Sequence, residues 1–319
     1  MTPRAPDAAI ETTGLAKRYG TTTALAGLTM RVPAGHVFGF LGPNGAGKTT
    51  AVKLLLGLAR PTSGDATVLG APLGDRATRR RIGYLPELFR YQAWLTARDV
   101  LGLHASLAEH PHGRRSSAIA DALELVGLGD RGDDRVGNFS KGMQQRLGLG
   151  VALLGRPDLV FLDEPTSALD PIGRQDVRAV IRELRDRGTA VFLNSHLLTE
   201  VERVCDEVAI VDHGRVVAAG SLDELLGAST VRIRVAGLDD AGRTQVAAFG
   251  ALSDDPPWLV VRGCPPERVP DLVAAIVGVG GRIHAVDAGR ETLEERFLGL
   301  LGHPADAADA ADVTEEPAR

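Results

Sequence analysis

The chain has 319 residues, enough for about two domains with a sizeable core. Its 36 basic and 41 acidic residues give a net charge of −5, which argues against a protein that binds nucleic acid through a broad basic surface. Its 2 cysteines, Cys205 and Cys264, lie far apart in sequence, so we expect unpaired thiols in a reducing cytoplasm rather than disulfide bonds.

No membrane-spanning segment is expected from the sequence. The longest apolar stretches without a charge are Leu147–Gly155 and Leu272–Gly281, and each has about half of the ~18 residues that a membrane-spanning helix needs. The N-terminal residues contain no apolar run typical of a signal peptide. Any role at a membrane would therefore depend on a partner protein.

The first predicted elements lead into a glycine-rich turn. Short strands are expected at Ile10–Gly14 and Leu25–Val32, on either side of a turn near Tyr19. Val37–Leu41 is apolar throughout, which favours a strand that is covered on both faces. After the turn, apolar residues at helical spacing predict a helix at Ala51–Leu58. The sequence thus predicts a strand, a glycine-rich turn and a helix in immediate succession.

This turn has the spacing of a phosphate-binding loop. It fits G-x-x-x-x-G-K-[ST], in which glycines let successive backbone N–H groups point inward at phosphate oxygens. The positive end of the following helix adds to that field. Lys48 is placed to reach the β- and γ-phosphates, and the Thr49 hydroxyl can ligate Mg²⁺. The candidate nucleotide-binding residues are Gly42, Pro43, Asn44, Gly45, Ala46, Gly47, Lys48, Thr49 and Thr50.

The next part of the chain interrupts the alternation of strands and helices. Strands are expected at Ala66–Leu69 and at Ile82–Leu85, and the second leads into Glu87. Apolar residues at helical spacing then run from Thr96 to about Gly155. We expect this block, at about residues 88–156, to form a helical subdomain inserted between two strands.

The alternation resumes after the helical block. Apolar strands are expected at Leu159–Asp163 and Ala190–Leu193, with a helix at Gly173–Arg187 between them. One more helix and two more strands are expected at Leu198–Cys205, Glu207–Asp212 and Arg215–Ala218. Strands that alternate with helices favour a mostly parallel sheet with helices on both faces. The predicted fold class is α/β, that of a P-loop NTPase.

The remainder of the chain predicts a small α+β domain. Thr230–Val235 alternates apolar and basic residues, as in a half-buried strand. Further helical and strand patterns follow at Gly242–Ala251, Trp258–Val261, Glu267–Val277, Arg282–Val286 and Thr292–Leu301. Residues 303–319 are rich in Ala, Asp and Glu and predict a disordered acidic tail. The expected domains are a flexible lead-in at 1–8, a nucleotide-binding domain at 9–228, an accessory domain at 229–302 and the tail.

Two carboxylates follow the apolar strand that comes after the helical block. Asp163 and Glu164 would lie at the carboxyl end of a parallel strand, where open α/β sheets place their ligands. Asp163 can hold Mg²⁺ opposite Thr49, and Glu164 can polarise a water for attack on the γ-phosphate. His196 follows the next strand, so we expect it at the same edge, in contact with the γ-phosphate. The predicted catalytic residues are Glu164 and His196.

Together these motifs resemble the ATP-binding subunit of an ABC transporter, from Ile10 to about Leu226. Gly42–Thr49 matches the Walker A motif of that family and Leu159–Asp163 matches Walker B, with Glu164 in the place of the catalytic glutamate. Three further matches are Ser167–Asp170 to the D-loop, His196 to the switch histidine and Tyr19 to the aromatic residue that stacks on adenine. The resemblance therefore adds Tyr19 and Asp170 to the expected nucleotide-binding residues.

The family signature, Leu-Ser-Gly-Gly-Gln, reads Phe139-Ser140-Lys141-Gly142-Met143 in this chain. The resemblance implies that Ser140 and Gly142, which are kept, meet the γ-phosphate of ATP held by a second subunit. Ser140 is also a suitable N-cap for the following helix. Glu87 stands where the family usually has Gln, at a position that contacts Mg²⁺ and links the site to the membrane partner. A carboxylate can ligate Mg²⁺, but when ionised it cannot donate a hydrogen bond as an amide does.

The resemblance also implies how the protein works. It predicts an ATPase that forms a head-to-tail dimer around two ATP molecules, with identical chains as the expected case. A separate integral membrane permease would hold the chain at the inner face of the cell membrane. Tyr84–Glu87, the signature and Leu293–Leu298 are similar to ABC-2 exporters such as the daunorubicin-resistance-like ATPases, which favours export of a drug, antibiotic, lipid or polysaccharide.

A second interpretation stays open at this point. Some ABC ATPases have no transport role and act on ribosomes or DNA. Such relatives typically carry two cassettes in one chain, long coiled coils or zinc modules, and the sequence shows none of these. The acidic net charge also disfavours a nucleic-acid partner.

Overall fold

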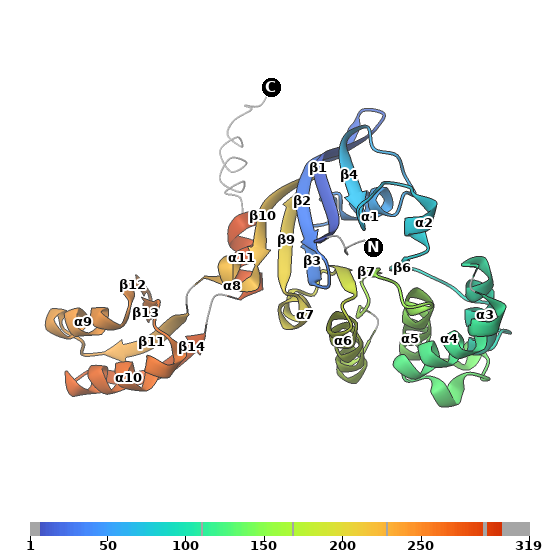
Figure 1. Ribbon diagram of the computed structural model, residues 1–319. Helices are drawn as coiled ribbons and strands as arrows, with labels where there is room; N and C mark the ends of the chain where they lie inside the picture. Colours follow the sequence, from blue (N-terminus) through green and yellow to red (C-terminus); the bar gives the residue numbers. More distant parts are fainter. Residues whose placement is uncertain (1–6, 110, 168, 228, 290–291, 302–319) are drawn as a thin grey trace, which may run out of the picture. The chain divides into compact units, whose positions relative to one another are not determined.

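The computed structural model describes residues 7–109, 111–167, 169–227, 229–289 and 292–301 (Figure 1). Its helices and strands divide into two compact units, one ending at Ser221 and one beginning at Leu222. The second unit therefore includes α8 (Leu222–Leu226), which packs on α11 (Leu293–Leu301), and the division lies a few residues before the predicted boundary at 228/229. Residues 1–6 of the predicted lead-in and the predicted tail at 303–319 lie outside the described residues.

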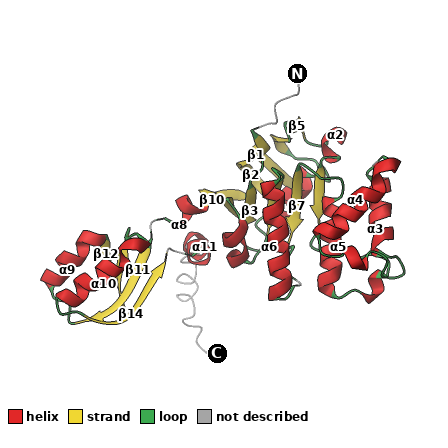
Figure 2. Cartoon of the chain, turned by 60° about the horizontal axis from the view of Figure 1, so that its bottom comes forward, coloured by secondary structure: helices red, strands yellow, loops and turns green. Residues whose placement is uncertain are grey.

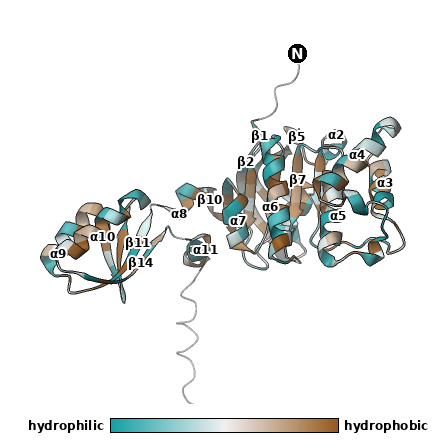
Figure 3. Ribbon diagram, turned by 90° about the horizontal axis from the view of Figure 1, so that it is seen from below, coloured by the Kyte–Doolittle hydropathy of each residue, from teal (hydrophilic) through white to brown (hydrophobic). Residues whose placement is uncertain are grey.

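A six-stranded sheet forms the centre of the first unit. Its order is β10 (Arg215–Ser221), β9 (Glu207–Asp212), β3 (Val37–Leu41), β8 (Ala190–Asn194), β7 (Leu159–Asp163) and β6 (Ile82–Leu85). Neighbouring strands run parallel from β9 to β6, and β10 is antiparallel to β9. Strands β3, β7 and β8 are buried along their whole length, because each is an almost uninterrupted apolar run. Figure 3 shows this hydrophobic interior around β7.

An antiparallel sheet covers part of one face of the central sheet. Its order is β2 (Thr22–Pro33), β1 (Ala8–Tyr19), β4 (Ser63–Val68) and β5 (Ala71–Pro72). Together with α1 (Lys48–Leu55) it packs on the aromatic side chains of the central sheet, where the rings of Phe40 and Phe192 lie 5.1 Å apart. The sequence did not predict that an antiparallel sheet would share a face of the central sheet with α1. Strands β1 and β2 are also longer than predicted, because their polar residues continue the ladder beyond the apolar runs.

Apart from α1 and α2, the helices of the first unit form two groups. Helices α3 (Ala97–Leu107), α4 (His112–Leu125) and α5 (Lys141–Leu153) lie between β6 and β7 in the chain and are grouped together in Figure 2. Helices α6 (Pro171–Asp186) and α7 (Leu198–Val204) follow β7 and β8, and a short α2 spans Arg76–Arg79. Thr96 and Asp99 form a reciprocal capping box at the start of α3. No helix in the described parts of the chain is long and apolar enough to span a membrane.

Besides α8 and α11, the second unit contains a four-stranded antiparallel sheet with two helices on one face. The strand order is β12 (Ala251–Asp255), β13 (Trp258–Arg262), β11 (Thr230–Ala236) and β14 (Arg282–Gly289). Helices α9 (Asp240–Val246) and α10 (Val269–Gly278) bury the apolar residues of β11 and β13. The sequence predicted a helix at Gly242–Ala251, but α9 ends at Val246 and β12 begins at Ala251. Because β12 carries only one large apolar residue, its sequence shows no strand pattern. Short 3₁₀ helices span Gly129–Arg131, Val136–Asn138, Ala247–Phe249 and Pro266–Arg268.

Candidate nucleotide site

The predicted phosphate-binding loop connects β3 to α1 and is held tightly on two sides. At Gly42, an added Cβ would lie 2.3 Å from the carbonyl oxygen of Val211. At Gly47, φ is +96° and an added Cβ would lie 2.4 Å from the carbonyl oxygen of Ala24. Only glycine fits both positions, because of close backbone approach at the first and the left-handed conformation at the second. The loop is therefore fixed between β2 and β9.

Lys48 begins α1 and turns its ammonium group back over the loop. Its Nζ donates to the carbonyl oxygens of Gly42 at 2.7 Å and Pro43 at 3.1 Å. Burial lowers the pKa of Lys48, while the negative charges of Glu164, Asp163 and Glu87 oppose that change. The ammonium group thus faces acidic side chains that come from distant parts of the chain. Next to it, the Thr49 side chain is exposed.

Asp163 ends β7, with its carboxylate buried next to the end of β8. Its side chain is 5% exposed, and Oδ1 accepts a hydrogen bond of 2.5 Å from Nδ2 of Asn194. Burial raises the pKa of the Asp163 carboxyl, and the bond from Asn194 opposes that rise. Glu87 and Glu164 add to the rise through their negative charges, whereas Lys48 lowers it. The ends of β6 and β7 and the start of α1 therefore converge at one place.

Glu164 is held in an uncommon backbone conformation beside the end of β8. Its φ is +52°, a left-handed value that a non-glycine residue adopts only where its surroundings impose it. The backbone N–H of His196 donates to Oε1 at 2.9 Å, and the ring Nδ1 of His196 lies 2.8 Å from Oε2. The Ser195 hydroxyl lies at 3.5 Å from the same carboxylate. The structure thus brings together Glu164 and His196, the two residues predicted to be catalytic.

Sequence reasoning gave no role to Asn194 and Ser195, although both lie in this cluster. Their side chains are buried, at 4% and 2% exposure. The sequence did contain a signal for such a role: Asn194 and Ser195 directly follow an apolar strand, and α/β sheets place their ligands at that edge. What the sequence did not contain was the pairing of β7 with β8, in which Asp163 lies opposite Asn194.

Glu87 follows β6 and is exposed at the same edge of the sheet. Its charge acts on Lys48 and Asp163, as described above, and on Tyr84, whose pKa is raised by burial first and by the charges of Asp163 and Glu87 second. Glu87 therefore belongs to the same electrostatic cluster as the loop lysine and the β7 carboxylate. Whether it ligates a metal stays a prediction.

Tyr19 lies at the tip of the β1–β2 hairpin. Its side chain is 49% exposed, and Nζ of Lys17 lies 4.8 Å from the ring centroid. The same hairpin contributes Ala24, whose carbonyl group packs against Gly47 of the phosphate-binding loop. An exposed ring on an element that borders this loop is available for stacking, and its contact with adenine stays a prediction.

Ser140, Gly142 and Asp170 lie at helix starts rather than in the cluster around Lys48. The Ser140 hydroxyl caps α5 by accepting from the backbone N–H of Met143 at 3.2 Å. The Asp170 carboxylate caps α6 by accepting from Gly173 at 2.7 Å. Both side chains are exposed, which leaves room for a contact from outside the chain. Ala168, within the predicted D-loop, lies outside the described residues.

The residues at this edge of the sheet fit a hydrated magnesium ion. The described residues contain no group of three or more His, Cys, Asp or Glu side chains that could hold a metal by themselves. Mg²⁺ needs fewer protein ligands, because it is commonly bound by one or two carboxylates plus substrate phosphates and water. Asp163 supplies a carboxylate, and Oδ1 of Asn194 is a buried acceptor with no hydrogen-bond partner in the described structure. Such an acceptor suits a coordinated water.

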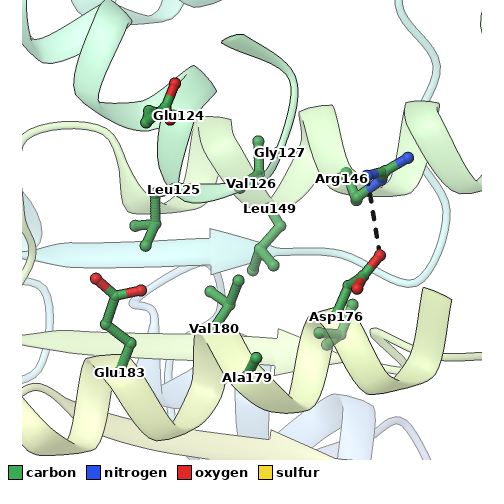
Figure 4. Close-up of a pocket in the computed structure, with 11 residues that line it drawn as sticks. Glu124, Leu125, Val126, Gly127, Arg146, Leu149, Asp176, Ala179, Val180 and Glu183 are labelled. Atoms are coloured by element: carbon green, nitrogen blue, oxygen red, sulfur yellow. Dashed lines mark ion pairs between the residues drawn. The ribbon is translucent and has the colours of Figure 1, made fainter. Parts of the chain in front are cut away.

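A separate cavity between the two helix groups does not include the candidate residues. It has a volume of ≈ 280 Å³ and lies between α4, α5 and α6, where Leu149 and Val180 approach each other (Figure 4). Arg146 and Asp176 border it with an ion pair of 3.9 Å. Its walls contain neither the loop glycines nor the carboxylates of β7, so it is not the nucleotide site.

Comparison with known proteins identifies the kind of protein to which this geometry belongs. The family described as ABC transporter matches residues 25–167. An ABC transporter ATP-binding protein of Nostoc sp. is 40% identical, over 94% of this chain and 92% of that protein. The daunorubicin/doxorubicin resistance ATP-binding protein DrrA of Streptomyces peucetius is 36% identical, over 98% of both chains. A solved structure described as the ATP-binding subunit of an ABC transporter has a TM-score of 0.62 and 31% identity, and the match covers 68% of this chain and 91% of that one.

Proposed function

The chain belongs to the ABC transporter family as an ATP-binding subunit, and we propose that its ATPase cycle drives export through a separate permease of the ABC-2 type. Subunits of this family hydrolyse ATP, dimerise and pair with a membrane permease. We assign the nucleotide cycle to residues 9–228 and treat residues 229–302 as an accessory domain.

The observation that carries the proposal is the convergence of four side chains from different segments. Lys48, Asp163, Glu164 and His196 meet where α1 begins and where β7 and β8 end. Lys48 binds and neutralises phosphate oxygens, and Asp163 with Thr49 would hold Mg²⁺. When bound, that ion supplies positive charge that stabilises the transferring phosphoryl group. Glu164 accepts the proton of the attacking water, and His196 orients the Glu164 carboxylate.

The exposed helix starts support a site that is completed by a second chain. Ser140 is the N-cap of α5 and Gly142 lies in its first turn, and a helix N-terminus attracts phosphate because its first N–H groups have no partner within the helix. We propose that they close over the ATP on the loop of the partner, with Asp170 nearby. With one cassette in each chain, two identical subunits would enclose two ATP molecules head to tail.

The export role is supported by the relative named for daunorubicin and doxorubicin resistance, which matches the chain over 98% of its length. A match of this extent to transporter subunits does not favour the alternative of a ribosome- or DNA-acting ATPase. Between β6 and the end of α3, four large apolar side chains are exposed and available to a partner: Leu88, Trp94, Leu103 and Leu107. The cargo contacts the permease and not this chain, so the permease determines which cargo is bound.

The test is co-expression with an integral membrane protein of the ABC-2 permease type, sought among the genes that neighbour the gene of this chain. We expect the two to purify together from detergent and to hydrolyse ATP in vesicles, with activity lost in the Glu164→Gln variant. Purification with ribosomes or DNA, and not with the membrane protein, would support the alternative instead. Activity of the chain alone with no change on addition of the permease would contradict the coupling.

A further inference from the structure

Strands β7 and β8 are adjacent and parallel, and their last residues, Asp163 and Asn194, are register partners. The two side chains are also joined, because Nδ2 of Asn194 donates to Oδ1 of Asp163 at 2.5 Å. Both are buried, at 5% and 4% exposure. A charge-assisted hydrogen bond of this length fixes the orientation of the carboxylate.

Asn194 makes a second link to the same edge of the sheet. Its backbone carbonyl accepts from the backbone N–H of Glu164 at 2.8 Å. Its side-chain oxygen Oδ1, in contrast, is buried with no hydrogen-bond partner among the described residues. Native proteins rarely leave such an acceptor unpaired, and a well-packed strand end would accommodate an apolar residue at lower cost. The orphaned oxygen therefore points to a donor that comes from a ligand.

We propose that Asn194 is a positioning residue for metal binding. Its amide N–H holds one carboxylate oxygen of Asp163, so that the other is presented to a divalent cation, and its amide oxygen accepts a hydrogen bond from a water bound to that cation. The inference rests on the proposed metal role of Asp163. Residues that orient a ligand in this way commonly change metal affinity by about 10- to 100-fold when they are replaced.

A matched pair of substitutions separates positioning from simple packing. Threonine and valine have almost the same shape and both suit a strand, but only threonine retains a donor. The probe is Mn²⁺, with its binding to the full chain measured by electron paramagnetic resonance in the presence of a non-hydrolysable ATP analogue. We expect Asn194→Val to weaken Mn²⁺ binding about tenfold or more, and Asn194→Thr, whose shorter side chain keeps one hydroxyl that can donate and accept, to weaken it clearly less.

The controls distinguish this inference from the function on which it rests. Thr12→Val removes an equally buried hydroxyl, at 4% exposure, in strand β1, and we expect unchanged Mn²⁺ binding. Nucleotide binding in EDTA should be the same for all three variants. If Asn194→Val does not fold, Asn194→Ala takes its place with the same expected loss.

Equal Mn²⁺ affinity in the valine and threonine variants would overturn the role of Asn194. Asp163→Asn provides the reference, because it removes the proposed ligand itself and should lose binding. If Mn²⁺ binding is lost in Asp163→Asn but not in Asn194→Val, the role of Asn194 is overturned and the metal role of Asp163 is retained. Unchanged binding in Asp163→Asn would overturn the proposed metal role as well.

Discussion

The ring nitrogen Nδ1 of His196 lies 2.8 Å from Oε2 of Glu164, while the backbone N–H of His196 donates to Oε1 of the same carboxylate at 2.9 Å. One residue thus contacts both oxygens of the proposed base. The His196 side chain is 61% exposed and Glu164 is 10% exposed, so the imidazole is the part of this pair that a nucleotide can reach. The arrangement couples the orientation of the base to a side chain at the site entrance.

Replacing His196 should impair chemistry more than binding. His196→Ala removes the ring contact but keeps the backbone donor, so Glu164 would remain in place with a poorly defined orientation. We expect hydrolysis to fall about 10²- to 10⁴-fold, with the ATP dissociation constant little changed. Steady-state ATPase rates and equilibrium ATP binding measure the two effects. His284→Ala, in the exposed strand β14, is the control, and an equal loss there would show a nonspecific effect.

Replacing Lys48 should weaken ATP binding. Its ammonium group already lies over the loop carbonyls, and its contacts to phosphate would be hydrogen bonds between charged groups. Loss of such a bond costs about 1.5–3 kcal/mol, so Lys48→Ala should raise the ATP dissociation constant about ten- to a hundredfold. Isothermal titration in the absence of turnover gives this value. Lys53→Ala, an exposed lysine on the same helix, should bind ATP as the wild type does.

Glu87→Gln should be well tolerated. The substitution removes one negative charge that acts on Lys48 and Asp163, and an amide oxygen can still ligate a metal. We expect ATPase activity to stay within about an order of magnitude of the wild type. Complete loss of activity would mean that the carboxylate has an essential role that this assignment does not include.

Arg178 and Glu200 join α6 to α7 through two bonds of 2.8 and 2.7 Å, with side chains only 14% and 10% exposed. Breaking a buried pair leaves an unpaired charge, so Arg178→Met should destabilise the protein by about 3–5 kcal/mol. The double variant Arg178→Met/Glu200→Leu should recover most of that loss. Urea unfolding measures both. A double variant as unstable as the single one would show that the pair itself contributes the stability.

The sequence predicted the elements that are set by local pattern. Strands β3, β7 and β9 have the predicted bounds, because each is a short apolar run that ends at polar residues or glycine. It did not predict β12, whose few apolar residues become a strand only by pairing with β13. It also underestimated β1 and β2, whose length depends on pairing with each other. The presence of β12 and the lengths of β1 and β2 therefore depend on pairing between strands, which cannot be read from one sequence.

The same distinction applies to the candidate site. The phosphate-binding loop is contiguous, so its spacing alone indicated the eight residues from Gly42 to Thr49. The contacts of Asn194 with Asp163 and of His196 with Glu164 depend on the register of β7 and β8, which the sequence leaves open. Glu87 joins them only because β6 pairs with β7. Polar residues after apolar strands were therefore recognisable as candidates, but their partners were not.

The central claim is that two chains enclose ATP, and the Glu164→Gln variant tests it most directly. The control is the double variant Glu164→Gln/Gly142→Asp, which places a negative charge at the start of α5 where an added Cβ would lie 3.4 Å from Leu169 and meet no backbone. Molar mass is measured by light scattering with and without ATP and Mg²⁺, alongside hydrolysis. We predict that Glu164→Gln hydrolyses ATP about 10²- to 10⁴-fold more slowly and has the mass of two chains only with ATP, while the double variant stays monomeric. A Glu164→Gln chain that remained monomeric with ATP and hydrolysed it at the normal rate would contradict the account.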